Sequence, residues 1–274
     1  MERQLNAYLA HLKDQERSSR TRQQYQRDIR HFLRHASDTI WNKETVIQYK
    51  RALQGKYRPS SVNAKLAAVN GFLTFIGMDG LRVRQLRVQH RSYCPEEKAL
   101  TKAEYLRLLQ AAKQQKDERL SLLVQTICST GIRVSELQFI TVQAVNRGEA
   151  QICLKGKTRT ILIAGKLRKA LTRYLQREKI ATGPLFVTRS ERPLDRSNIW
   201  KMLKALSGRA GVDAQKVFPH NLRHLFARCF YAIDKDLAKL ADVLGHSNIN
   251  TTRIYIISSG QEHLQRMDAL GLVV

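Results

Sequence analysis

The feature that most constrains how this chain folds is one long interruption in its helical apolar pattern. Up to Phe75, apolar residues recur three and four positions apart, as they do on one face of a helix. The stretch that follows, GMDGLRVRQLRVQHRSYCPEEKAL, contains two glycines, a proline and several arginines but no apolar stripe. A helical pattern returns after Thr101. We therefore expect two domains, over residues 1–82 and 99–274, joined by a linker over residues 83–98.

The first domain is predicted to be a helical bundle. Pro59 stands where a helix accepts proline, in its first turn. The basic stretches SSRTRQQYQR and KYRPSSVNAK lie near the starts of two helical segments, where backbone N–H groups and arginines could contact phosphates. The helices are predicted from three apolar stripes: Leu5, Tyr8, Leu9 and Leu12; Tyr25, Ile29, Phe32 and Leu33; and Val62, Leu66, Val69 and Leu73.

The second domain is predicted to be mixed, mainly α-helical with a small antiparallel β-sheet. TKAE, beginning at Thr101, has the pattern of a helix-capping box, and Gly131 and Gly245 stand where two apolar helical stripes end. Between these glycines, AQICLKGKTRTILIAG changes to short β-rich runs on either side of Lys155 and Gly156, which indicates a hairpin. Two more helices are expected, over 167–174 and 199–206.

The charge of the chain points to a polyanionic partner. Lys and Arg total 48 against 23 Asp and Glu, a net charge of +25, and residues 1–92 hold 18 basic and 7 acidic residues, so both domains are basic. A nucleic acid, with DNA the first candidate, would neutralise this excess. No apolar run is long enough to span a membrane. Free thiols in a reducing cytoplasm are expected, because no CxxC pair or metal spacing joins the four cysteines, Cys94, Cys128, Cys153 and Cys229.

Two arginines in separate motifs are candidates for binding one phosphate. Pro219, immediately before HNLRH, favours a helix start, and His220 and Arg223 then share a helix face near that start. In TGIRVSEL, Arg133 follows a helix end, and Glu136 is placed to form an ion pair with it. Two guanidinium groups from distant segments could clamp the non-bridging oxygens of one phosphodiester.

A lysine and a tyrosine could supply chemistry at such a phosphate. Lys155 lies at the predicted hairpin turn, where its ammonium could protonate a leaving oxygen, and Lys157 competes with it for this role. In LGHSNINTTRIY, Tyr255 follows His246 by nine residues. The tyrosine is either a packing residue or a covalent nucleophile. Because no cluster of carboxylates accompanies the histidines, we expect no metal site and no cofactor.

Taken together and in this order, TGIRVSEL, the hairpin, HNLRH and LGHSNINTTRIY resemble the motifs of the tyrosine site-specific recombinases, the phage-integrase and Xer-like group. The resemblance covers nearly the whole chain. It implies a SAM-like, helical core-binding domain that clamps DNA, followed by a mixed α+β catalytic domain. Within the catalytic domain it implies that Arg133, Arg223 and His246 hold the scissile phosphate. Tyr255 would then attack phosphorus, and Lys155 would be the general acid.

The resemblance also implies a reaction and an assembly. His220 would act as general base or phosphate ligand, and Glu136 would support the arrangement of Arg133 and His220. A 5′-hydroxyl from a partner strand would reseal the DNA, without metal or nucleotide. The enzyme would work as a tetramer on two sites in double-stranded DNA, with its C-terminal tail packed in cis or on a neighbouring subunit. Two alternatives stay open: a type IB topoisomerase-like relaxase, and a catalytically inactive, sequence-specific DNA-binding protein.

Overall fold

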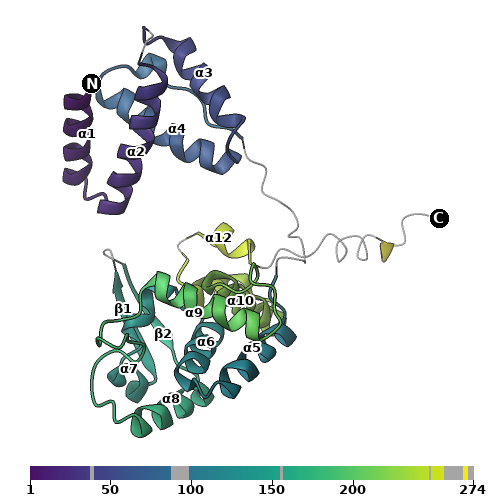
Figure 1. Cartoon of the computed structure of the whole chain (residues 1–274). Coiled ribbons are helices and arrows are strands. Elements are labelled where there is room, and N and C mark those ends of the chain that lie inside the picture. The colour runs from purple at the N-terminus through teal and green to yellow at the C-terminus, as the bar shows by residue number, and fades with distance from the viewer. Residues whose placement is uncertain (38–39, 88–98, 155–156, 247, 256–267, 271–274) are drawn as a thin grey trace. The chain divides into compact units, whose positions relative to one another are not determined.

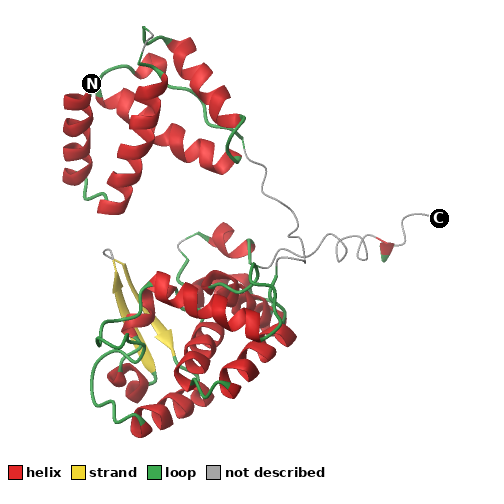
Figure 2. Cartoon of the chain, in the orientation of Figure 1, coloured by secondary structure: helices red, strands yellow, loops and turns green. Residues whose placement is uncertain are grey.

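The computed structural model describes residues 1–37, 40–87, 99–154, 157–246, 248–255 and 268–270. The chain divides into two compact units, Met1–His90 and Arg91–Val274 (Figure 1). Helices dominate both units, and the sheet that the described residues form is one two-stranded hairpin (Figure 2). The predicted fold class, mainly α with a small antiparallel sheet in the second unit, is confirmed.

The described residues of the first unit form four α-helices, of which the sequence predicted three. The additional helix, α3, was missed because its buried apolar stripe is short, consisting of Val46, Tyr49 and Leu53. It begins at a capping box formed by Asn42 and Thr45. The elements are α1 (Glu2–Asp14), α2 (Ser19–His35), α3 (Lys43–Gln54), α4 (Pro59–Phe75) and the 3₁₀ helix η1 (Asp79–Leu81).

The first residues of the expected linker pair with side chains of α4. The amide of Asn70 accepts from the backbone N–H of Val83 at 3.0 Å and donates to its carbonyl at 2.8 Å. Asn63 makes the same pair of bonds with Leu86, at 2.7 and 2.8 Å. Each asparagine side chain thus supplies the hydrogen-bond donor and acceptor that a neighbouring strand would otherwise provide to this segment of backbone. The rest of the expected linker, residues 88–98, lies outside the described residues.

The second unit packs its helices around α6, whose residues Leu123, Val124 and Ile127 are fully buried. The capping box predicted at Thr101 is confirmed, with its hydroxyl accepting from the backbone N–H of Glu104 at 3.1 Å. The helices are α5 (Lys102–Gln114), α6 (Glu118–Thr130), the 3₁₀ helix η3 (Val134–Phe139), α7 (Val142–Arg147), α8 (Gly165–Arg177), α9 (Arg196–Arg209), α10 (Pro219–Asp234), α11 (Leu237–Leu244) and α12 (Ile249–Arg253).

The predicted hairpin is present. Strand β1 (Glu149–Leu154) pairs antiparallel with β2 (Lys157–Leu162), and Leu154 lies opposite Lys157. Ile152 and Ile161 bury one face of the sheet against the core. The connection between the strands, which contains Lys155, lies outside the described residues.

Glycines end α6 and α11 as predicted, and both are needed there. Gly131 and Gly245 each adopt the left-handed conformation, with φ of +62°. A Cβ at Gly131 would lie 2.5 Å from the ring of Phe226 and 2.9 Å from Leu244, so its absence lets α6, α10 and α11 meet closely. Within the described part of the chain, no helix is long and apolar enough to cross a membrane.

Candidate active site

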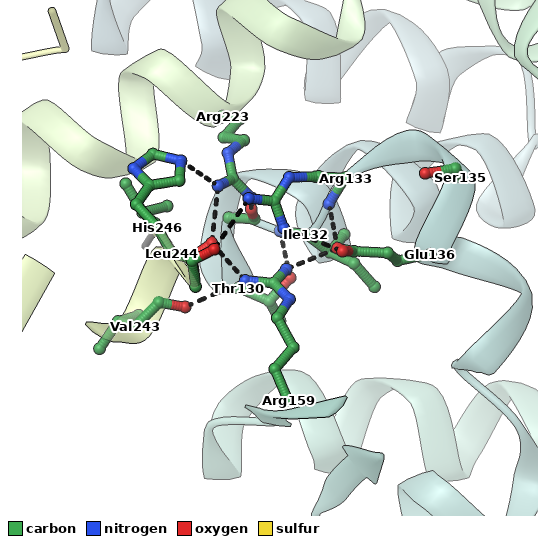
Figure 3. Close-up of polar contacts among 12 residues, drawn as sticks. Thr130, Ile132, Arg133, Ser135, Glu136, Arg159, Arg223, Val243, Leu244 and His246 are labelled. Carbon is green, nitrogen blue, oxygen red and sulfur yellow. Dashed lines mark hydrogen bonds and ion pairs between the residues drawn. The ribbon is translucent and has the colours of Figure 1, made fainter. Parts of the chain in front are cut away.

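Four segments far apart in the sequence bring polar side chains to one point of the second unit. Arg133 follows α6, Arg159 lies on β2, Arg223 lies near the start of α10, and His246 follows α11. Figure 3 shows the three guanidinium groups pointing toward one another. Three cations this close repel, so the arrangement depends on the acceptors around them.

One acceptor is the buried carboxylate of Glu136, in η3. Its Oε1 accepts from Arg133 Nη1 at 3.0 Å, and its Oε2 accepts from Arg159 Nη2 at 2.5 Å and from the backbone N–H of Arg133 at 2.9 Å. Burial alone would raise the pKa of Glu136, but these hydrogen bonds and the charge of Arg159 outweigh it and lower the pKa. The carboxylate therefore stays ionised, and the ion pair predicted between Arg133 and Glu136 is confirmed.

The other acceptors are carbonyl oxygens at helix ends. Arg223, only 2% exposed, donates to the carbonyls of Gly131, which ends α6, and of Leu244, the last residue of α11, the latter at 2.8 Å. Arg133 donates to the carbonyl of Gly245 at 3.1 Å. Helix C-termini carry partial negative charge and unpaired carbonyls, so they hold these cations where water is excluded. Burial, and secondarily the charge of Arg133, lower the pKa of Arg223 to about 10.

His246 is held between a donor and an acceptor. Its Nε2 lies 2.9 Å from Arg223 Nη2, and its Nδ1 lies 2.8 Å from the hydroxyl of buried Thr252. Because a guanidinium can only donate, Nε2 accepts, and the proton of the neutral ring is on Nδ1, which donates to Thr252. Burial and then the charge of Arg223 lower the pKa of His246 to about 4, which favours this neutral form.

Tyr255 lies buried against the same cluster. Its side chain is 5% exposed and packs on Ala227, Leu240 and Leu244. Three histidine rings surround it, with centroid distances of 4.2 Å to His224 and 5.5 Å to both His220 and His246. The charge of Arg223 also interacts with Tyr255. The position of Tyr255 therefore combines packing in the core with a place beside the arginine cluster.

The structure brings together Arg133, Glu136, Arg223, His246 and Tyr255. His220 lies at the exposed edge, and partial desolvation followed by the charge of Arg223 lowers its pKa. Lys155 lies outside the described residues, and Lys157 is the first residue of β2. Among the described residues, no three His, Cys, Asp or Glu side chains group as metal ligands would.

Sequence reasoning missed three contributors: Arg159, Thr252 and His224. Arg159 carried no signal beyond its position two residues after Lys157 on a predicted strand. His224 is the last residue of HNLRH, one helical turn after His220, so helical spacing alone placed it on the same face. Thr252 lies within TTRIY, but its contact with His246 depends on the turn between α11 and α12.

Family models match both units of the chain. Residues 98–262 match the model of the phage integrase family, and residues 5–77 match the phage integrase N-terminal SAM-like domain. Tyrosine recombinase XerD of Xanthomonas campestris pv. campestris is 30% identical over 236 residues, which cover 79% of this chain and 73% of that protein. Tyrosine recombinase XerD of Halalkalibacterium halodurans is 30% identical over 261 residues, 87% of each chain.

Solved structures share the fold. A lambda integrase dimer bound to a COC′ core site superposes with a TM-score of 0.73 at 17% identity, covering 95% of this chain and 96% of that one. A XerH site-specific recombinase bound to a palindromic difH substrate gives a TM-score of 0.71 at 18% identity, covering 90% and 78%. The matching family model spans more than half of the residues, and the relatives span most of them. The chain therefore belongs to the phage integrase family of tyrosine site-specific recombinases.

Proposed function

We propose that this chain is an enzyme that cuts and rejoins duplex DNA at specific sites through a 3′-phosphotyrosine intermediate. The observation that carries the proposal is the placement of Tyr255, buried in the same cluster as Arg223 and His246. Core packing of a tyrosine does not require a cluster of arginines beside it. A phenol that attacks a phosphate needs cations at that place.

The two arginines from separate segments supply the phosphate site. Arg133, whose side chain is 38% exposed, offers a guanidinium to the DNA, and Arg223 offers one from the floor of the site. Arg223 donates to His246 Nε2 at 2.9 Å. We place a non-bridging phosphate oxygen where it would accept from Arg223 in place of that nitrogen. The cations then neutralise the charge that grows on the oxygens in the pentacoordinate transition state.

These side chains support a reaction in two steps, cleavage and rejoining. The Oη of Tyr255 attacks phosphorus in line while the bond from phosphorus to the 5′ oxygen breaks. His220, in the role of general base, takes the phenolic proton, and Lys155 or Lys157 protonates the leaving 5′ oxygen. For rejoining, a 5′-hydroxyl attacks the phosphotyrosine and releases the phenol. The energy of the broken bond is kept in the protein–DNA link, so no nucleotide is consumed.

We assign the wider organisation on the same basis. Residues 1–82 clamp DNA, and residues 83–98 link them to residues 99–274, which carry the chemistry. The chain ends in a docking tail, most of which lies outside the described residues. The partners are double-stranded DNA and further copies of the chain, four on two sites. A net charge of +25 supports the first partner. A cytoplasmic location fits a DNA substrate and the described cysteines, which are free thiols.

The proposal is tested by covalent capture of DNA. The protein is incubated with sheared genomic DNA of its host in EDTA, denatured with detergent and recovered, and the DNA that stays bound is sequenced. The recovered site is then placed in a nicked duplex, in which loss of a short fragment traps the phosphotyrosine link. We expect an adduct with the wild type and none with Tyr255→Phe, which lacks only the attacking oxygen.

The outcomes separate the alternatives. An adduct with Tyr255→Phe would mean that another residue is the nucleophile. If the wild type formed no adduct with any fragment but bound DNA, the chain would be an inactive DNA-binding protein. Two labelled duplexes carrying the site distinguish a recombinase from a relaxase, because only a recombinase joins a strand of one duplex to the other.

A further inference from the structure

Arg159, on β2, binds an acceptor of Arg133 and an acceptor of Arg223. Its Nη2 donates to Glu136 Oε2 at 2.5 Å, and its Nη1 donates to the carbonyl of Leu244. Glu136 also binds Arg133, and the Leu244 carbonyl also accepts from Arg223. One guanidinium therefore shares an acceptor with each of the two arginines proposed to hold the phosphate (Figure 3).

The guanidinium of Arg159 is already bound by acceptors of the protein. Its side chain is 14% exposed, against 38% for Arg133, and both of its terminal nitrogens are engaged. Its Nε is buried and has no hydrogen-bond partner among the described residues. A buried donor without a partner is destabilising, so stability alone does not explain this arginine.

Arg159 also shapes the turn that carries His246. A Cβ at Gly245 would lie 2.6 Å from Arg159 Cδ and 2.7 Å from its Nη1, so the arginine stem fills the space a side chain would take. The same guanidinium binds the carbonyl of Leu244, immediately before that glycine. Contacts from Arg159 on β2 thus hold the C-terminal end of α11 in place.

We propose that Arg159 is a positioning residue for the cleavage reaction, which sets the spacing of Arg133, Arg223 and His246 around the scissile phosphate by bridging Glu136 to the C-terminal carbonyls of α11. This proposal rests on the proposed function. Because β2 is one strand of the hairpin that carries the candidate general acids, Arg159 also links this hairpin to the proposed phosphate site.

The test measures single-turnover cleavage of the nicked duplex by Arg159→Met, which keeps an unbranched apolar stem and removes the guanidinium. Misplacing the phosphate ligands should slow cleavage by about 10²-fold. A second duplex carries a methylphosphonate at the scissile position, where a methyl group replaces one charged oxygen. With less charge to neutralise, placement of the arginines matters less, so most of the difference between variant and wild type should disappear.

The matched control is Arg119→Met. Arg119 is half-buried and donates to the carbonyl of Val187 at 2.7 Å, and it lies at the other end of α6 from Thr130, roughly 16 Å away at 1.5 Å per residue. It should cleave both duplexes at the wild-type rate. Arg159→Lys keeps the charge, but its single nitrogen cannot span both acceptors, so it should behave like Arg159→Met. If Arg159→Met does not unfold cooperatively, Arg159→Lys takes its place in the test.

Each outcome has one meaning. Wild-type rates in the Arg159 variants overturn the positioning role and leave the proposed function intact. Equal slowing on both duplexes also overturns it, because a general loss of structure does not depend on phosphate charge. A wild type that forms no adduct overturns the proposed function and this inference with it.

Discussion

At the scale of single residues, the three imidazole rings around Tyr255 decide which protonation states the site can hold. His224 and His246 both have pKa values lowered to about 4, by burial first and then by neighbouring positive charge. Burial, assisted by nearby positive charge, thus keeps these rings neutral at physiological pH. Neutral rings leave the positive charge of the site on Arg133 and Arg223, where a phosphate would meet it.

Burial of neutral His224 makes the stability of the protein depend on pH. Its pKa falls from 6.5 to about 4 on folding, so between these values the unfolded chain binds more protons. Keeping His224 neutral therefore costs no folding free energy above pH 6.5, and the protein loses stability as the pH falls toward 4. His224→Phe, which keeps a ring against Tyr255, should lose about 2 kcal/mol less than wild type between pH 7.5 and pH 5. Urea unfolding at both pH values checks this, and equal losses would contradict it.

The sequence identified the candidate residues that lie in recognisable motifs, but not the residues that contact them. Arg133, Arg223 and His246 stand in motifs whose local helix starts and ends could be inferred. Arg159 could not be assigned, because its role arises from contacts with Glu136, 23 residues away, and with Leu244, 85 residues away. Such contacts depend on how β2 packs against α11, which periodicity does not encode.

At the scale of elements, the site is built from the ends of helices. The carbonyls that bind arginine belong to the ends of α6 and α11, and both helices are terminated by a glycine in the left-handed conformation. These ends were predictable because glycine acts locally. Helix α3 and the pairing of residues 83–86 with α4 were not, since the first has a short stripe and the second depends on two asparagines distant in sequence.

The close approach at Gly131 predicts a large effect of a small side chain. Gly131→Ala would incur about 1–2 kcal/mol from the left-handed backbone and a further 1–3 kcal/mol from contacts with Phe226 and Leu244. Gly211 is the matched control, since its φ is +58° and nothing lies within 4 Å of a Cβ built there. Gly211→Ala should show only the backbone effect. Thermal melting of both variants compares them, and equal Tm losses would rule out the contact contribution.

At the scale of the whole molecule, the positive charge is more than the catalytic chemistry requires. The proposed phosphate site uses Arg133 and Arg223, whereas the chain carries a net charge of +25. The first ninety-two residues alone hold 18 basic and 7 acidic residues. Charge spread in this way suits a long polyanion, contacted at many phosphates by both units.

This distribution predicts how binding to DNA depends on salt. Each neutralised phosphate contributes about 0.9 to the slope of log K against log salt, so ten contacts give a slope near −9. Arg20 and Arg27 are exposed on α2 and lie two turns apart on one face. Replacing both with glutamine should reduce the slope by about 1.8, measured in EDTA with a duplex of arbitrary sequence. Arg177→Gln should leave the slope unchanged, because Arg177 is already paired with Glu118 and Glu178. A reduction of about 0.9 in Arg177→Gln, half that of the double variant, would mean that total charge, rather than contact by the first unit, sets the slope.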